Sequence, residues 1–334
     1  MWFHIIMKYM NMQYKNSYFA AAAAGFLLLL FSVVYIVFGG QGDVSAFRKE
    51  SRCVFGVTYM TMNNPYYKVI DENLRSLIEG NGDVLLKRDA ALNQDRQNEE
   101  IRELISAGAE LIFVVPVQWT GVEEGLRIAA AAGVPVIILD APAENDELAS
   151  CSIISDNYEA GVLCAKHLME NRDSAEILLL EHISASSGRE RIQGFLDTIE
   201  GHDSYRVVGS GESDGQIENA MPVMERLLRQ NPQADTVMAL NDPSAFGAMA
   251  AIEAAGLLDR FYVYGVDGSP EAKTLIKDGM MVATCAQFPS KVASSAVRTA
   301  YAVLGGRPVA DKITVEVELI TKDNVSEFDT EGWQ

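Results

Sequence analysis

The chain has 334 residues, of which 49% are hydrophobic, and this is enough for two domains that each have a core. Residues 1–39 contain two lysines and no acidic residue, so the remainder carries 25 basic and 46 acidic side chains, a net charge of −21. A body this acidic repels nucleic acid and anionic membrane surfaces, and we expect no nucleic-acid partner. The four histidines lack the spacing of metal ligands, and we expect no metal site.

The N-terminal part contains an apolar run of 21 residues, 18–38. At about 1.5 Å per residue this run matches a hydrocarbon core of roughly 30 Å, and it is longer than the apolar region of a cleaved signal peptide. We predict an uncleaved transmembrane anchor over residues 18–39, after an N-terminal segment 1–17 and before a flexible linker 40–52. A cleaved signal is the alternative, because Val44-Ser45-Ala46 resembles a cleavage site. Basic residues flank the run on both sides, so charge alone does not give the orientation.

From residue 53 onward, strand-like and helix-like patterns alternate with short turns. The strands are uniformly apolar, which is typical of parallel sheets that helices cover on both faces. We predict strands at 53–60, 83–87, 110–115, 134–140, 152–155, 175–180, 205–209, 235–240, 261–266, 281–286 and 312–320. We predict helices at 66–79, 94–107, 120–132, 158–169, 188–200, 216–229, 243–255, 270–278 and 289–304.

Three helix starts have recognisable signals. Pro65 follows Asn63-Asn64 and is well placed to open a helix whose first turn carries two tyrosines. Thr120 and Glu123 match a capping box, which predicts that the helix begins there. Ser269-Pro270-Glu271 combines a cap, a proline and a first-turn acid.

The two halves of the body resemble each other. The segment 113–140 runs strand, loop, helix, Ala-Ala-Gly, strand and aspartate, and the segment 238–267 repeats this order. We therefore predict an α/β fold with two similar Rossmann-like lobes of parallel sheet that face a shared cleft, in addition to the N-terminal transmembrane helix.

The four cysteines contain no C-x-x-C pair and lie in strand-like or helix-like apolar runs. We interpret Cys53, Cys151, Cys164 and Cys285 as buried thiols that pack as small hydrophobes. A disulfide between Cys151 and Cys164 is the alternative in an oxidising compartment.

Polar side chains follow several apolar strands at the point where each strand ends. In an open α/β sheet this is where ligands bind, and an amide beside two aromatic rings suits a neutral polyhydroxylated ligand. The candidates are Asn64, Tyr66, Tyr67, Asp140, Asn241, Asp267 and Gln287, together with Arg191 near a helix start. Structural roles are the alternative for three neighbours: Asp242 as a helix cap, Arg189 as a surface or salt-bridge residue, and Asn63 as a turn residue.

The order of these motifs resembles that of type I periplasmic sugar-binding proteins of the ribose-binding family. The resemblance covers about residues 53–322 and rests on Asn63-Asn64-Pro65-Tyr66-Tyr67, Leu139-Asp140, Ser155-Asp156-Asn157, Arg189-Glu190-Arg191 with Gly194-Phe195, Asn241-Asp242, Gly265-Val266-Asp267-Gly268-Ser269-Pro270 and Ala283-Thr284-Cys285-Ala286-Gln287. It implies two lobes joined by three crossings near Ser155, Gln287 and Val317.

The resemblance also implies the division of the body and the roles of its residues. Lobe I would comprise 53–155 and 288–316, and lobe II 156–287 and 317–334. The eight candidates named above, from Asn64 to Gln287, would bind a small neutral sugar or polyol. A monomeric receptor tethered through residues 18–39 on the extracytoplasmic face would present this ligand to an ABC permease or a membrane sensor.

Four positions depart from the ribose-binding pattern or could modify it. Ala141 replaces an arginine that holds the sugar, Met60 replaces a small polar residue, and Gly215 falls where an aromatic ring would stack. Trp119 could refill part of that space, although simple packing is the alternative. These departures argue against ribose itself as the ligand.

Two other classes of function are disfavoured. A repressor-type effector protein would need an N-terminal helix-turn-helix and a basic DNA surface, and this chain has an apolar run and an acidic body. A glycosidase would use Asp140 and Asp267 as its acid and base, but Arg191 between them would keep both ionised. Gly209-Ser210-Gly211 is not a phosphate loop, because acidic residues follow it. We therefore predict no catalytic residues and no cofactor.

Overall fold

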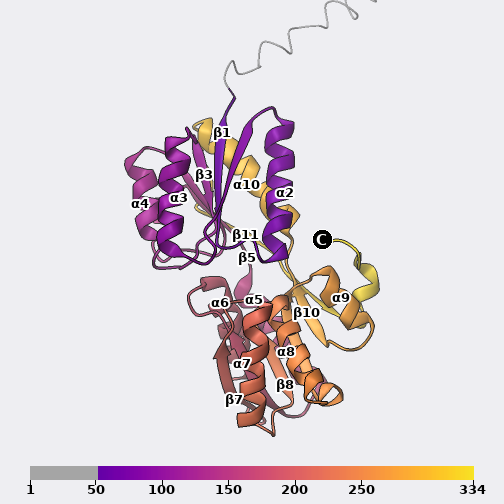
Figure 1. Ribbon diagram of the computed structural model, residues 1–334. Coiled ribbons are helices and arrows are strands. Elements are labelled where there is room, and N and C mark those ends of the chain that lie inside the picture. The colour runs from indigo at the N-terminus through magenta and orange to yellow at the C-terminus, as the bar shows by residue number, and fades with distance from the viewer. Residues whose placement is uncertain (1–51) are drawn as a thin grey trace, which may run out of the picture. The chain divides into compact units, whose positions relative to one another are not determined.

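The computed structural model describes residues 52–334, and residues 53–334 form one compact unit (Figure 1). The predicted transmembrane anchor at 18–39 and nearly all of the linker lie outside the described residues. Within residues 52–334, no helix combines the length and the apolar character that crossing a membrane requires.

The first of two six-stranded sheets has the strand order β11-β5-β4-β3-β1-β2, and all of its neighbouring strands are parallel. Its strands are β1 (Val54–Tyr59), β2 (Val84–Asp89), β3 (Leu111–Val114), β4 (Val136–Asp140), β5 (Cys151–Ser155) and β11 (Lys312–Val315). Alternate residues of these strands point to opposite faces, so each face of the sheet needs its own cover of helices.

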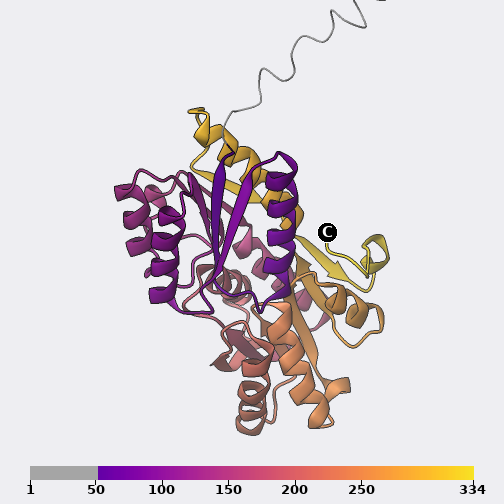
Figure 2. The same cartoon turned by 45° about the horizontal axis from the view of Figure 1, so that its top comes forward.

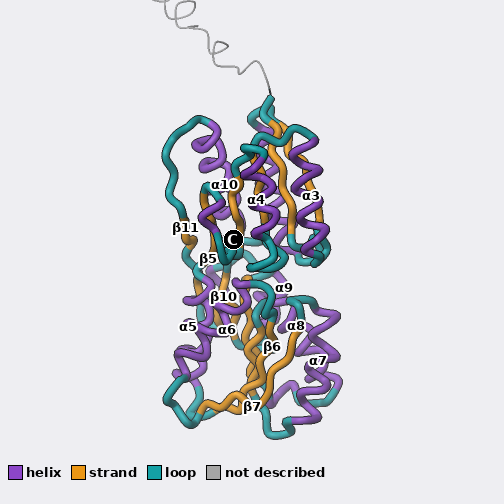
Figure 3. The backbone as a smooth tube through the Cα atoms, turned by 90° about the vertical axis from the view of Figure 1, so that its left-hand side faces the viewer, coloured by secondary structure: helices purple, strands orange, loops and turns teal. Residues whose placement is uncertain are grey.

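Four helices cover this sheet. On one face, α2 (Pro65–Gly80) packs beside α10 (Pro289–Leu304), although they are far apart in the sequence (Figures 1 and 2). On the other face lie α3 (Gln94–Ser106) and α4 (Glu123–Ala131), which pack beside each other (Figure 3). Their apolar side chains form a separate core with β3 and β4. We call this sheet and its helices lobe I.

The second sheet, in lobe II, has the strand order β12-β10-β9-β8-β6-β7 and therefore repeats the first sheet position by position. Its strands are β6 (Ala175–Glu181), β7 (Tyr205–Glu212), β8 (Thr236–Ala239), β9 (Tyr262–Asp267), β10 (Ala283–Ala286) and β12 (Glu318–Thr321). Its helices are α5 (Asn157–Asn171), α6 (Ser186–Ile199), α7 (Ile217–Gln230), α8 (Asp242–Ala254) and α9 (Pro270–Lys277). One core lies under α5 and α6, and another under α7, α8 and α9.

The chain passes between the two sheets three times: after Ser155, after Ala286, and between Val315 and Glu318. The strand predicted at 312–320 is therefore two strands, β11 and β12, which belong to different sheets. The expectation that the sheets are wholly parallel is wrong for β12, which is antiparallel to β10. The reason is that the chain enters lobe II at the edge of the sheet that holds the carboxyl ends of the other strands, so β12 runs in the opposite direction.

Two further expectations concern local chemistry. The prediction that a capping box at Thr120 starts the helix is wrong, because α4 begins at Glu123 and has no side-chain cap. The side chains of Gln94 and Gln97 accept hydrogen bonds from the backbone of the preceding loop, at Gln118 and Val117, and the loop continues past Thr120. All four cysteines are buried and free, so the structure contains no disulfide between Cys151 and Cys164.

Helices α5 and α6 approach each other so closely that two glycines are required where they meet. A Cβ atom on Gly161 would lie 1.8 Å from the carbonyl oxygen of Arg191, and one on Gly194 would lie 2.1 Å from that of Tyr158. Any larger residue at either position would force the helix backbones apart. This contact fixes the backbone of Arg191 relative to α5.

Candidate functional site

A pocket lies where the carboxyl ends of the strands of both lobes meet, and its empty space, including the open solvent at its mouth, is about 390 Å³. The sequence-predicted residues that line it are Asn64, Tyr66, Tyr67, Asp140, Arg191, Asn241, Asp267 and Gln287, along with Met60 and Gly215. Trp119 and Ala141 are not among the lining residues. The structure thus brings all eight candidates from separate strand ends and helix starts to one place.

The tyrosines come from the first turn of α2. Asn64 caps this helix, because its side-chain oxygen accepts a hydrogen bond of 2.9 Å from the backbone N–H of Tyr66. The Tyr66 and Tyr67 rings meet edge to face, with 5.6 Å between centroids. The Tyr67 hydroxyl donates to Oδ2 of Asp140 at 2.9 Å. The cap therefore fixes both rings and leaves the amide nitrogen of Asn64 able to donate to a ligand.

Asp140 and Asp267 end β4 and β9, the third strand of each sheet, and both are buried. Both have a positive backbone φ, 70° and 141°, which is rare for a residue other than glycine. Strained backbone of this kind persists only where the surroundings hold it, and it is concentrated at functional sites.

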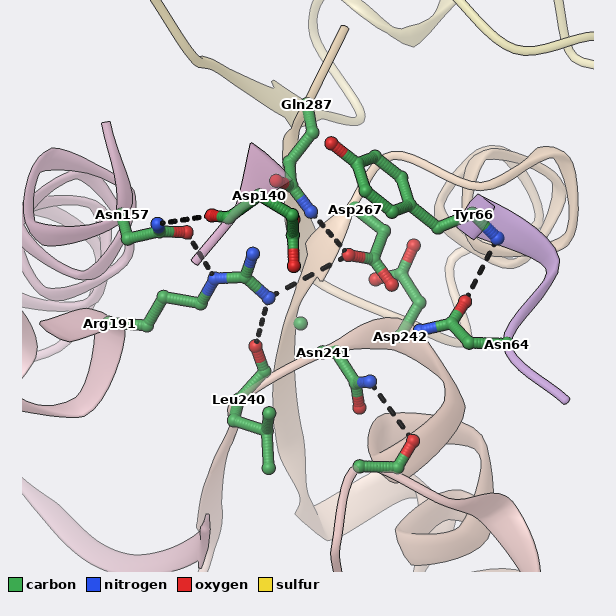
Figure 4. A network of polar contacts seen from close by, with 12 residues as sticks. Asn64, Tyr66, Asp140, Asn157, Arg191, Leu240, Asn241, Asp242, Asp267 and Gln287 are labelled. Carbon is green, nitrogen blue, oxygen red and sulfur yellow. Dashed lines mark hydrogen bonds and ion pairs between the residues drawn. The ribbon is translucent and has the colours of Figure 1, made fainter. Parts of the chain in front are cut away.

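Arg191 lies between the two aspartates and is itself 4% exposed. Its Nε donates to Oδ1 of Asn157 at 2.9 Å and its Nη1 donates to the Leu240 carbonyl at 3.0 Å (Figure 4). The same Nη1 lies 3.8 Å from Oδ1 of Asp267. Two of its contacts thus serve to hold the guanidinium in place, and its charge is shared by two carboxyl groups.

The pKa of Asp140 is raised by its burial, which Arg191 and the Tyr67 hydrogen bond oppose. The pKa of Asp267 is raised well above its ordinary value by burial and by the nearby charge of Asp242, again against Arg191. For both carboxyls the effect of burial on the pKa is larger than that of the one shared guanidinium. That Arg191 keeps both carboxyls ionised stays a prediction.

Asn241 and Asp242 both make structural hydrogen bonds at the pocket, and the cap role that was the alternative for Asp242 belongs to its neighbour. The helix cap is Asn241, whose Oδ1 accepts from the Ser244 N–H at 3.0 Å and whose Nδ2 donates to the Gly215 carbonyl at 3.0 Å. Asp242 is not the cap: it accepts from Thr284 Oγ1 at 2.6 Å and from the Ser269 N–H at 2.8 Å. It therefore ties three neighbouring strand ends together from within lobe II.

Three buried acceptor atoms at the pocket have no hydrogen-bond partner within residues 52–334: Oδ1 of Asp140, Oδ2 of Asp267 and Oε1 of Gln287. The other oxygen of Asp267 accepts from Nε2 of Gln287 at 2.7 Å. The hydroxyls of Tyr66 and Ser155 lie near each other without reaching hydrogen-bonding geometry. Buried polar atoms are normally paired, so this concentration of unpaired acceptors indicates that hydrogen-bond donors of a ligand complete the site.

The pocket also has lining residues that the sequence analysis missed, including His182, Asp214 and Gln216. His182 directly follows β6 and Asp214 closely follows β7, so the strand-end pattern that identified Asp140 could have found both. Burial lowers the pKa of His182 against the opposing charge of Asp214, which favours a neutral imidazole.

One group within the described part of the chain offers three metal-ligating side chains. The ligand atoms of His182, Glu212 and Asp214 lie within 4.8 Å of one another. Both oxygens of Glu212 accept from the Ile183 N–H, at 3.1 and 3.2 Å, so this carboxylate has a structural role without a cation. We assign no metal to this group.

Contacts between the lobes surround the pocket. A turn role was the alternative for Asn63, and its amide nitrogen donates across to Gln216 Oε1 at 2.7 Å and Glu218 Oε1 at 2.9 Å. The Trp119 ring lies 4.4 Å from the guanidinium carbon of the exposed Arg189. Trp119 therefore packs against the opposite lobe in this structure.

Comparison with known proteins agrees with this geometry. Residues 55–308 match the model of the periplasmic binding protein domain family. The ribose import binding protein of Escherichia coli is 30% identical over 264 residues, which is 78% of this chain and 88% of that protein. That of Bacillus subtilis is 29% identical over 269 residues, 80% of this chain and 87% of that protein.

Solved structures give the same result. A solute-binding protein of an ABC transporter from Mycobacterium smegmatis, with bound glycerol, has a TM-score of 0.79 and 28% identity, and the match covers 83% of this chain and 96% of that one. The Caulobacter myo-inositol binding protein has a TM-score of 0.78 and 25% identity, over 84% of this chain and 96% of that one. These relatives are solute-binding proteins and not enzymes. The fold, the pocket and these matches together show that the chain belongs to the periplasmic binding protein family and is a type I sugar-binding member of it.

Proposed function

We propose that this protein binds a small neutral sugar or polyol in the pocket between its lobes. The observation that carries the proposal is the set of three buried acceptors, on Asp140, Asp267 and Gln287, that have no partner among the described residues. Sugar hydroxyls donate hydrogen bonds, and bonds to carboxylates are among the stronger ones. Arg191 and the amide of Asn64 supply donors for the oxygen lone pairs of the same hydroxyls.

The character of the ligand follows from the rest of the pocket. Asp140, Asp214 and Asp267 repel an anion, and Arg191 is the single arginine or lysine that lines the described pocket. The faces of Tyr66 and Tyr67 suit the apolar C–H surface of a ring. The presence of Ala141 in place of a second arginine supports a ligand other than ribose, and the ligands of the similar solved proteins include glycerol and myo-inositol.

Binding would proceed by closure of the two lobes about the three crossings, in which the ligand stabilises the closed state. The relatives imply an extracytoplasmic location, and their roles in import support presentation of the ligand to an ABC permease, with a membrane sensor as the alternative. Tethering through residues 18–39 remains part of the proposal. Fractionation tests it: the tethered protein stays with membranes after a high-salt wash, and a cleaved one is released.

Titration calorimetry on residues 47–334 tests the binding proposal with D-ribose, D-allose, L-arabinose, myo-inositol and glycerol. We expect saturable binding of at least one of these compounds, and a rise in melting temperature because the ligand binds only the folded state. Arg191→Met should abolish this binding, whereas Arg127→Met, on the surface of lobe I, should not change it. Absence of binding and of any thermal shift across the panel would contradict the proposal.

A further inference from the structure

The last three residues of the sequence, Gly332–Gln334, lie against the binding site. Figures 1 and 2 mark this end of the chain with the letter C. The three residues contact α9, the ends of β9 and β10, and helix α2 of lobe I. We call them the C-terminal strap. They lie beyond residues 55–308, the part of the chain that the family model matches.

The amide of Gln334 bonds to the backbone of two pocket residues. Its Nε2 donates to the carbonyl of Gln287 at 2.7 Å and to the carbonyl of Asp267 at 3.2 Å. Gly268 leaves room for this amide, because a Cβ atom there would lie 2.5 Å from Nε2. The carbonyl of Asp267 also accepts from the Gln287 N–H at 3.0 Å. One side chain thus joins the carboxyl ends of β9 and β10 at two of the three pocket residues that carry unpaired acceptors.

Lobe I contains a similar arrangement. Asp140 also has a positive φ, and its carbonyl accepts a weak hydrogen bond of 3.4 Å from the side-chain amide of Asn157. In both lobes a side-chain amide from another segment therefore bonds to the carbonyl of the strained aspartate. Because strained backbone persists only where neighbours over-determine it, these amides help to hold the carboxyl groups in place.

The strap is itself held by a buried lysine. Lys273 in α9 has no exposed surface, and its Nζ donates to the Gly332 carbonyl at 2.7 Å and to Oε1 of Gln334 at 3.0 Å. Burial lowers the pKa of this ammonium group, and nearby acidic residues oppose the shift. A buried ammonium needs hydrogen-bond acceptors, and the strap supplies two of them.

The strap also reaches the aromatic wall of the pocket. The Trp333 ring lies 5.9 Å from that of Tyr66, centroid to centroid, with 58° between the ring planes. Tyr66 belongs to lobe I, whereas Lys273, Asp267 and Gln287 belong to lobe II. The strap therefore contacts pocket residues of both lobes at once.

We propose that Gln334 and Trp333 are positioning residues of the binding site. Gln334 orients Asp267 and Gln287 through their backbone, Trp333 fixes the ring of Tyr66, and Lys273 holds the strap. The effect on affinity rests on the proposed function, but the effect on the backbone of Asp267 and Gln287 does not.

The substitution Gln334→Glu separates positioning from stability. A glutamate still accepts from Lys273 but cannot donate to the two carbonyl groups. In the full chain we expect the backbone amide of Gln287 to exchange its hydrogen several times faster without ligand. We expect a roughly tenfold weaker affinity for the sugar of the panel that binds best, because the ligand must then order the strand ends that the Gln334 amide no longer fixes. The melting temperature should stay within about 2 °C of the original, because the new carboxylate pairs with the Lys273 ammonium and this offsets the lost hydrogen bonds.

Four further variants, at three positions, accompany this one. Gln233→Glu makes the same change on an exposed side chain and should alter neither exchange nor affinity. Trp333→Ala should weaken binding about fivefold, and Trp333→Phe, which keeps a ring against Tyr66, should restore most of it. Lys273→Met should lower the melting temperature, and the size of this fall shows what a loss of stability alone looks like.

The outcomes are distinct. Unchanged exchange at Gln287 together with unchanged affinity in Gln334→Glu would overturn the proposal. So would a fall in its melting temperature as large as that of Lys273→Met, because the role of Gln334 would then be structural. If the original protein binds no sugar of the panel, the proposed function fails, and the ligand-free exchange rate at Gln287 still decides whether the strap orders the strand ends.

Discussion

Asp140 and Asp267 occupy the same position in the two lobes, at the end of the third strand of each sheet, and both adopt a positive φ there. Each also keeps one buried carboxylate oxygen without a partner within residues 52–334. Each lobe thus places at the pocket an aspartate that has a strained backbone and an unpaired carboxylate oxygen. Such an arrangement is costly for the ligand-free protein, and this cost can be measured.

Replacing either aspartate with asparagine should stabilise the ligand-free protein and weaken ligand binding. Asparagine keeps the shape and tolerates a positive φ, but it removes a buried charge. We expect Asp140→Asn to raise the free energy of unfolding in urea by about 1–2 kcal/mol and to reduce sugar affinity at least tenfold. Asp203→Asn, at an exposed position, should change neither quantity. A destabilised Asp140→Asn variant would contradict this account.

The same reasoning predicts a dependence on pH. The folded-state pKa of Asp140 is raised by burial, so proton binding favours the folded state. This stabilisation is fully present below the unfolded pKa of about 4 and is lost as pH rises through the folded pKa. The advantage of Asp140→Asn in melting temperature should therefore be near zero at about pH 4 and grow toward about pH 8. Melting curves of both proteins across this range, without ligand, provide the test, and a constant difference would refute it.

Arg191 should matter for stability as well as for binding. Its removal leaves Asp140 and Asp267 without their shared cation and leaves the Leu240 carbonyl without its donor. Arg191→Met should lower the free energy of unfolding by about 3 kcal/mol at neutral pH, and by less in acid, where the carboxyls are protonated. Arg127→Met removes an exposed arginine paired with Glu123 and should cost less than about 0.5 kcal/mol. Equal losses in the two variants in urea titrations would show that the buried charges do not depend on Arg191.

The contact between α5 and α6 gives a prediction about how Arg191 is placed. Gly161→Ala puts a Cβ atom 1.8 Å from the Arg191 carbonyl, so the helices must separate, at a cost of about 3 kcal/mol. Gly80→Ala is the matched control at the end of α2, where a Cβ atom meets nothing within 4 Å, and it should be neutral or stabilising by about 0.5 kcal/mol. Thermal unfolding of both variants measures this, and a tolerated Gly161→Ala would mean that the helices are less tightly packed than described.

The strand-end residues could be predicted from the sequence because a buried parallel strand leaves a clear apolar run, and a carboxylate directly after it is conspicuous. Asp140, Asp267 and Gln287 were found in this way. The same signal cannot give strand direction, because an apolar run reads alike in both senses, and β12 was therefore missed as an antiparallel strand. The strand-end pattern also cannot distinguish a helix cap from a ligand contact at Asn241 and Asp242, because both roles use the same polar groups.

Contacts between distant segments lay beyond sequence reasoning. Trp333 and Tyr66 are near opposite ends of the described chain, and no local pattern relates them. The position of Asn63 before Pro65 predicts a turn, and only the fold brings Gln216 and Glu218 to its amide. Such pairs depend on how two lobes meet, which the periodicity of individual helices and strands does not encode.

Trp119 provides a test of lobe closure that does not involve a ligand-lining side chain. Its ring packs against the Arg189 guanidinium of the opposite lobe, a contact worth about 0.5–1 kcal/mol. Because we propose that release requires the lobes to separate, Trp119→Ala should speed sugar dissociation about two- to fivefold in stopped-flow measurements, with little change in association. Trp119→Phe keeps an aromatic face, and its dissociation rate should lie between those of the original protein and Trp119→Ala. A changed ligand preference in place of faster dissociation would instead support direct contact between Trp119 and the sugar.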